Sequence, residues 1–155
     1  MLRSWADGAF AVEAAVELVI AHRTWLTRSD FRARLVDAVQ DGSGPAGTIV
    51  PMATIDWEQV PAFLDDVPSS SSESAILMFA SSLAGGHRGA SILAMTDGLD
   101  DSNAALVLEA LAHRFGWHER GQARLVGGTF DHDLTAVTPL RSPAAPMPAS
   151  AGSHE

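Results

Sequence analysis

The fold is decided by the stretch SSSSESAILMFASSLAGG, residues 69–86. Ser70 and Glu73 stand three apart ahead of an apolar run, which is the spacing of a capping box at a helix start. The run is apolar almost all round and two glycines follow it, so we predict a helix over 71–84 that stops at the glycines. A helix without a polar face belongs in the middle of a domain, and the other elements should pack around it.

Outward from this stretch, other segments repeat their apolar residues three and four apart, the period of a helix. The clearest is the alanine-rich segment AFAVEAAVELVIAH, where Glu13 and Glu17 share the polar face. Another begins at Asp100 or Asp101, which suit the positive end of a helix, and stops at Gly116. We predict helices at residues 9–22, 29–39, 57–66 and 101–115, with a short helical turn at 91–95.

Extended backbone is favoured in two segments. Residues 48–55 are β-branched, but Pro51 restricts them to a sheet edge or to no sheet. A second candidate is the segment 124–130. Four of the eight prolines fall in the last 17 residues among alanine and serine, a composition typical of a disordered tail.

These elements predict an all-α fold, a single compact domain of about five helices with a minor extended segment. The helical domain should cover residues 1–138, and the Pro/Ala-rich C-terminal tail 139–155. The apolar faces predict a core of Phe10, Val16, Ile20, Phe31, Leu35, Trp57, Leu64, Ile76, Phe79, Leu83, Val107 and Leu111.

Composition excludes several chemistries. The 155 residues are 46% hydrophobic and 19% charged, which is the composition of one ordinary globular domain. All ten cationic side chains are arginine, and the chain has no cysteine and no tyrosine. A Schiff-base lysine, a thiol nucleophile, a thiolate metal site and a disulfide are therefore excluded. The sequence indicates no cofactor.

Charge is unevenly distributed along the chain. Of the formal net charge of −9, residues 1–34 carry +1, residues 35–110 carry −10, and residues 111–155 carry none. The acidic middle argues against non-specific nucleic-acid binding and against an anionic membrane surface. It is explained by solubility alone, or by contact with a basic partner or the basic end of another copy.

The location is expected to be cytoplasmic, in a soluble protein without membrane contact. Glu13 and Glu17 interrupt the apolar stretch near the N-terminus, where a signal peptide needs an unbroken one. The longest apolar run, residues 75–86, is about twelve residues, and a membrane span needs about 20.

Three segments carry a resemblance. Residues 11–31 (AVEAAVELVIAHRTWLTRSDF), 70–73 (SSSE) and 99–113 (LDDSNAALVLEALAH) resemble a set of short helical bacterial proteins of unknown function. The similarity extends over about residues 5–120. The resemblance implies a compact helical domain and brings no activity with it.

The first group that could carry chemistry is Glu109, His113 and His118. Glu109 and His113 stand four apart on one helix face, and His118 follows the turn at Gly116. Carboxylate and imidazole are ligands for divalent metals, although this spacing matches no standard zinc pattern. The alternative is that Glu109 and His113 form an ordinary surface pair.

The second group is a basic cluster of Arg23, Arg28, Arg32 and Arg34 around Trp25. Guanidinium groups beside an indole could hold an anionic partner. The two flanking helices are separated by about seven residues, more than the three or four of a helix-turn-helix motif. The alternative is a solvated basic face, or pairing with the acidic middle of the chain.

Three functional hypotheses follow. The first is a non-enzymatic protein-interaction or regulatory module whose partner is a protein, either itself or another. The second is a small enzyme, or a metal- or ligand-binding protein, that uses Glu109, His113 and His118. The third is a nucleic-acid-associated regulator that uses the cluster from Arg23 to Arg34, which the acidic balance disfavours.

Overall fold

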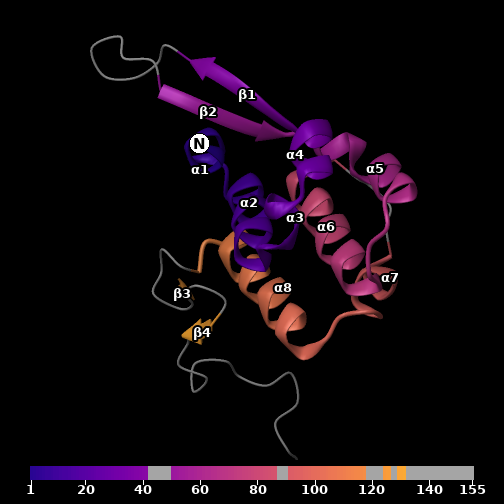
Figure 1. Ribbon diagram of the computed structural model, residues 1–155. Helices are drawn as coiled ribbons and strands as arrows, with labels where there is room; N and C mark the ends of the chain where they lie inside the picture. The colour runs from indigo at the N-terminus through magenta and orange to yellow at the C-terminus, as the bar shows by residue number, and fades with distance from the viewer. Residues whose placement is uncertain (42–49, 87–90, 118–123, 127–128, 132–155) are drawn as a thin grey trace, which may run out of the picture.

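The computed structural model describes residues 1–41, 50–86, 91–117, 124–126 and 129–131. Helices dominate these residues, and two short antiparallel strand pairs accompany them (Figure 1). The helices are α1 (Leu2–Ala6), α2 (Phe10–His22), α3 (Thr24–Thr27), α4 (Ser29–Leu35), α5 (Val60–Asp66), α6 (Ser71–Ala84), α7 (Ile92–Thr96) and α8 (Asp101–Arg114). The strands are β1 (Val36–Asp41), β2 (Val50–Ile55), β3 (Arg124–Val126) and β4 (Thr129–Asp131).

The fold is therefore mostly helical, but the prediction of an all-α fold with about five helices needs correction. The described residues contain eight helices, because α1 and α3 are pieces of four or five residues that sequence spacing does not reveal, and the short turn predicted at 91–95 is counted as a helix, α7. A 3₁₀ turn, η2 (Trp57–Gln59), leads into α5, and together they account for the helix predicted at 57–66. The predicted tail, 139–155, lies outside the described residues.

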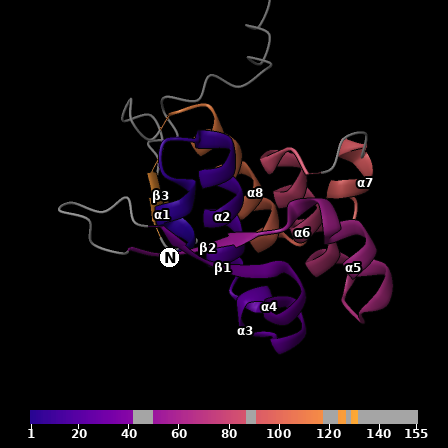
Figure 2. The same cartoon turned by 90° about the horizontal axis from the view of Figure 1, so that it is seen from above.

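Helix α6 begins at the capping box that the sequence predicts, and it shares the middle of the fold with α2. The Ser70 hydroxyl accepts a hydrogen bond from the Glu73 backbone N–H at 3.2 Å, and the Glu73 carboxylate accepts from the Ser70 N–H at 2.8 Å. Gly85 ends the helix in the left-handed conformation, with φ +83°. In Figure 1, α6 lies between α2 and α5, and α2 packs against both α6 and α8. The view from above in Figure 2 shows the same arrangement.

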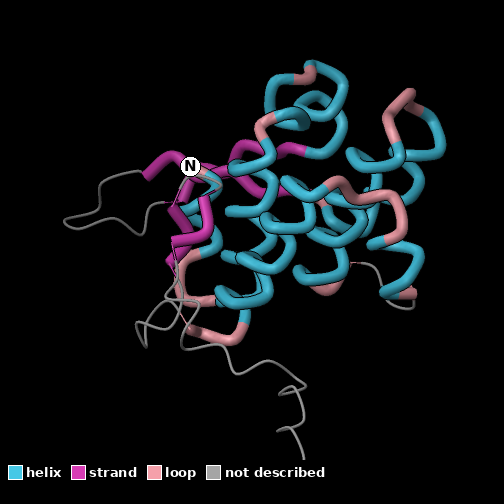
Figure 3. The backbone as a smooth tube through the Cα atoms, turned by 90° about the horizontal axis from the view of Figure 1, so that it is seen from below, coloured by secondary structure: helices cyan, strands magenta, loops and turns pink. Residues whose placement is uncertain are grey.

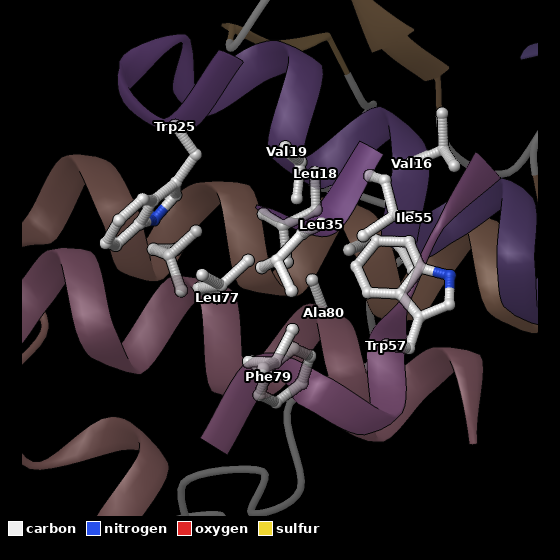
Figure 4. Close-up of a cluster of buried hydrophobic side chains, with 14 of the residues drawn as sticks. Val16, Leu18, Val19, Trp25, Leu35, Ile55, Trp57, Leu77, Phe79 and Ala80 are labelled. Atoms are coloured by element: carbon white, nitrogen blue, oxygen red, sulfur yellow. The ribbon is translucent and has the colours of Figure 1, made fainter. Parts of the chain in front are cut away.

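One apolar core joins these helices, and it includes buried residues from Ala6 in α1 to Ala110 in α8. Its centre is drawn in Figure 4. The rings of Trp25, Phe31 and Phe63 contact one another, with centroids 5.8–5.9 Å apart. Of the predicted core, the buried residues are Val16, Phe31, Leu35, Trp57, Ile76, Phe79 and Val107; the half-buried ones are Phe10, Ile20, Leu64, Leu83 and Leu111.

The helix predicted over 29–39 is wrong at its end, because the helical backbone stops at Leu35 and Val36–Asp41 is strand β1. β1 pairs antiparallel with β2, with Val36 opposite Ile55 and Asp41 opposite Val50. The partner strand lies a loop away in sequence, so spacing within residues 29–39 cannot reveal it. Of the extended segment predicted at 48–55, residues 50–55 are confirmed as strand β2, and residues 48–49 lie outside the described residues. Figure 3 draws the strands in magenta beside the cyan helices.

The second extended prediction, 124–130, corresponds to a hairpin rather than one strand, since β3 pairs antiparallel with β4. The turn predicted at 91–95 is α7, shifted by one residue. No helix in the described ranges is both long and apolar enough to span a membrane.

Two joints set the directions of the longer helices. Arg23 alone separates α2 from α3, and it adopts a left-handed φ of 65°, which favours glycine. At the end of α8, Gly116 has φ +70°, and the N–H groups of Gly116 and Trp117 donate to the carbonyls of His113 and Ala112. This pair of bonds is a Schellman motif, formed at the glycine where the sequence predicts that the helix stops.

Candidate functional site

The predicted metal group is not assembled by the part of the chain that the structure describes. Glu109 lies on the buried side of α8 and is only 3% exposed. Neither of its carboxylate oxygens has a hydrogen-bond partner among the described residues. Burial raises the pKa of this carboxyl above its ordinary value, since the charged form loses its hydration.

His113, four residues after Glu109, contacts helix α2 instead of Glu109. Its Nε2 lies 3.0 Å from Oε2 of Glu13 on α2, and its ring meets the Phe10 ring edge-on at 6.4 Å. The contact therefore links α8 to α2. His118 lies outside the described residues, and those residues contain no group of three or more His, Asp or Glu side chains placed to hold a metal ion.

Half of the arginine cluster is engaged within the fold. The Arg28 guanidinium forms a two-point bond to Asp30, at 2.6 and 3.0 Å, and also donates to the Pro68 carbonyl at 2.8 Å. Its hydrogen bonds to Asp30 lower the pKa of that carboxyl to about 2. Arg34 pairs with Asp66 on α5 at 2.8 Å. These two arginines therefore tie α4 and the segment before it to the region around α5.

Trp25 belongs to the core rather than to a binding surface. Its side chain is fully buried, and its indole N–H donates to the Glu73 carbonyl at 3.0 Å. An amphipathic ring whose N–H finds an internal acceptor is more stable inside than in water, which explains its position. Arg23 and Arg32 remain exposed and form no ion pair within the described ranges. The predicted cluster thus leaves two unpaired guanidinium groups.

A polar network at the starts of α6 and α8 was not predicted. The Asn103 side-chain amide donates to the Ser72 hydroxyl at 2.7 Å and to the Asp100 carboxylate at 2.9 Å. Asp100 also caps α8 by accepting from the Asn103 backbone N–H at 2.8 Å, and that bond is the main cause of its lowered pKa. A carboxylate held ionised as a cap is a poor general base near neutral pH, so this network joins two helix ends.

His22, at the end of α2, lies near the same network. Its Nδ1 is buried without a hydrogen-bond partner among the described residues. Burial lowers the pKa of His22, and the charges of Glu73 and Asp100 oppose this effect without reversing it. An imidazole in this setting is neutral at pH 7, and no described hydrogen bond connects it to the Ser72 hydroxyl. The group therefore lacks the serine–histidine contact that nucleophilic catalysis requires.

Helix α8 has a second apolar face, which lies on the solvent side, although the sequence predicted part of it, Leu111, to lie in the core. Leu108 and Phe115 are each 56% exposed, although both stand at helical spacing with Leu111, which was predicted to be buried. Ala104 and Leu111 lie between fully buried and exposed, on the same side of the helix. The inner face is already occupied by Leu106, Val107 and Ala110. On the other side, the residues Ala104, Leu108, Leu111 and Phe115 form an outer apolar face, in which Leu111 still packs partly against the core and the Phe115 ring contacts Trp117.

No family model, no curated protein and no solved structure matches this chain. The candidate site therefore rests on the geometry of the chain itself.

Proposed function

We propose that this protein is a protein-interaction module that binds its partner through the outer apolar face of α8. The observation that carries the proposal is the exposure of Leu108 and Phe115 on a helix whose opposite side already packs into the core. Single exposed apolar residues are ordinary, whereas two exposed ones on the same side of a helix, with half-buried apolar neighbours between them, form the kind of patch that marks an interaction surface.

The spacing of the row supports a helical binding mode. Ala104, Leu108, Leu111 and Phe115 stand at intervals of four, three and four residues, so they project from one side of the helix. Residues at these intervals are the anchors by which one helix binds a groove or another helix. Burial of apolar surface is worth about 25 cal/mol per Å², so an exposed leucine and phenylalanine offer a partner a substantial gain.

A protein partner is favoured over a nucleic acid by the charges. Arg28 and Arg34 are already paired with carboxylates, which reduces the charge available to phosphates. The chain as a whole carries a formal charge of −9. The face itself contains no charged residue.

The test compares two substitutions of the same kind. Leu108→Glu places a charge in the outer face, whereas Leu93→Glu places one on α7, where Leu93 is 73% exposed. Each variant is immobilised and offered both the purified chain and a cell extract. We expect a protein bound by the parent chain to be retained by Leu93→Glu and lost by Leu108→Glu, with unchanged far-ultraviolet circular dichroism. Equal retention by both variants would contradict the proposal.

A further inference from the structure

We infer that the outer edge of strand β1 is a docking site for an extended segment of another protein, one that carries arginine or lysine at alternate positions. β1 and β2 form a two-stranded sheet, so each strand has one edge that the other does not cover. In Figure 1 the two strands lie away from α8. The edge of β1 is therefore a second surface, and the inference goes beyond the function proposed above.

The hydrogen bonds of the sheet show which backbone groups of β1 point outward. The Asp56 N–H donates to the Leu35 carbonyl at 2.8 Å, just before the first paired residues of the two strands. Hydrogen-bonded and non-bonded pairs alternate along an antiparallel ladder. Counted from Leu35 and Asp56, the residues of β1 in non-bonded pairs include Ala38 and Gln40. These two residues therefore direct their N–H and C=O groups away from β2.

The outer edge of β2 is already occupied. Its outward-pointing residues include Pro51, which has no N–H, and Ala53, whose N–H donates to the Met1 carbonyl at 3.4 Å. Helix α1 packs against the same strand. The position of Pro51 agrees with the alternation of the ladder, because proline is tolerated in a strand where no donor to the partner strand is needed. An incoming strand therefore finds no free edge on this side of the sheet.

The outer edge of β1 is open within the described ranges of the chain. The N–H and C=O groups of Ala38 and Gln40 have no hydrogen-bond partner there. The main contacts of β1 are with β2 and with α4, the helix that precedes it. An antiparallel strand along this edge can form two hydrogen bonds at each of these residues, which is how the edge of a sheet binds an extended peptide.

The charge of the sheet favours a basic partner. Residues 36–56, which include both strands, contain three aspartates and no cationic side chain. One of these aspartates, Asp37, is exposed on β1. The arginines before it, Arg32 and Arg34, belong to α4, and Arg34 is paired with Asp66. Arginine or lysine at alternate positions of an added strand lies on one face of the sheet, where it offsets the acidic charge.

A second copy of β1 is a poor occupant of this edge. Two β1 strands side by side would bring aspartate near aspartate, because both carry Asp37 and Asp41. Like charges on neighbouring strands are destabilising. A charged residue on an edge strand thus protects it from pairing with its own kind, and the same charge attracts a basic segment.

Amide hydrogen exchange of the full chain tests the pairing at single residues. The probe is a synthetic peptide of about ten residues that alternates arginine with threonine and is long enough to cover β1. We expect saturating peptide to slow the exchange of the Ala38 and Gln40 N–H groups by about tenfold or more, because each gains an acceptor. Unchanged exchange at both residues at about 1 mM peptide would overturn the inference.

Two control peptides separate strand pairing from simple charge attraction. The first has glutamate in place of arginine, and the second keeps arginine but has methyl groups on its backbone nitrogens, which prevents strand pairing. We expect neither peptide to slow the exchange of Ala38 or Gln40. Protection by the glutamate peptide would contradict a basic partner, and equal protection by the methylated peptide would contradict docking as a strand. Exchange that slows with the concentration of the chain alone would assign the edge to a second copy and overturn the inference.

Two substitutions at one position test the outward N–H. Ala38→Pro removes this donor and Ala38→Val keeps it, while neither removes a hydrogen bond between β1 and β2. We expect the proline variant to bind a fluorescent arginine peptide about tenfold more weakly than the parent chain, and the valine variant to bind it equally well. Equal binding by the two variants would contradict a role for this N–H. Circular dichroism and the melting temperature check that each variant is folded.

Asp37→Arg tests the charge without changing the backbone, so it decides the question even if Ala38→Pro does not fold. We expect this variant to lose its preference for the arginine peptide over the glutamate peptide, and an unchanged preference would contradict selection by charge. The face of α8 fails separately, because Leu108→Glu should bind the arginine peptide as the parent chain does. Loss of peptide binding in Leu108→Glu would place the peptide on α8 and overturn the inference.

Discussion

At the scale of single residues, Gly86 is a position where the fold leaves no room for a side chain. A Cβ at this position would overlap Trp57, whose backbone carbonyl carbon would be only 2.5 Å away. The neighbouring Gly85 has open space but a left-handed φ of +83°. We expect Gly86→Ala to lower the free energy of unfolding by about 3 kcal/mol, the upper end for overpacking, and Gly85→Ala by about 1 kcal/mol. Urea denaturation measures both, and equal losses would contradict the crowding at Gly86.

Glu109 predicts a pH dependence at the same scale. Its pKa is raised by burial in the folded state, so the folded chain holds the proton more tightly than the unfolded chain, where the value is about 4.5. The free energy of unfolding should therefore fall as the pH rises from about 4.5 through the folded-state pKa, and then level off. Glu109→Gln imitates the protonated form and should remove this fall.

The check is a pair of urea titrations for the parent chain and Glu109→Gln across pH 4–8. The difference in stability between the two should grow with pH in favour of glutamine. If the difference in the free energy of unfolding between the two chains stays constant with pH, Glu109 has the same pKa in the folded and the unfolded state.

At the scale of elements, the start of α6 depends on its cap. Ser70→Ala removes the hydroxyl that accepts the Glu73 N–H, and we expect a loss of about 1 kcal/mol. Ser71→Ala, one residue on, is the matched control, because this exposed hydroxyl makes no described hydrogen bond, and its effect should be within about 0.5 kcal/mol. Thermal and urea unfolding compare the two. A similar loss of stability in both variants would show that the effect does not come from the cap, because any serine-to-alanine change in this turn would then destabilise the chain.

The same helices show how far the sequence can predict the fold. α2, α6 and α8 were predicted within a residue or two at each end because their signals are local. All three have apolar residues at helical spacing, and α6 and α8 also have a serine or aspartate before the first turn and a glycine after the last. β1 was missed because its stability comes from a partner strand that the local pattern does not contain. Propensity within residues 29–39 favours a helix, and pairing across a loop overrides it.

The candidate site was harder to predict for a related reason. His113 is on the expected helix, yet its partner is Glu13, 100 residues earlier, and not Glu109. Trp25 stands among arginines in the sequence, which suggested an indole beside an anion-binding cluster, but it is buried and its N–H donates to the Glu73 carbonyl of another helix. Helical spacing reveals that α8 has an apolar face, but it does not indicate which part of that face turns away from the core.

At the scale of the whole molecule, the single core predicts a single unfolding transition. Buried residues from α1 to α8 belong to one cluster, with Trp25 fully buried and Trp57 7% exposed. Because α2 packs against both α6 and α8, loss of one helix exposes the apolar faces of the others. We expect tryptophan fluorescence and far-ultraviolet circular dichroism to give the same urea midpoint. Two separated midpoints would contradict a common core.

The left-handed joint at Arg23 limits how this chain can change in length. Because only this one residue separates α2 from α3, the corner has no slack in which an added residue could be absorbed. An insertion would turn the indole of Trp25 by about 100° around its helix and remove it from the Glu73 carbonyl. Chains that keep this architecture can exchange one amino acid for another at the corner, but gaps and extra residues between the two helices are incompatible with it.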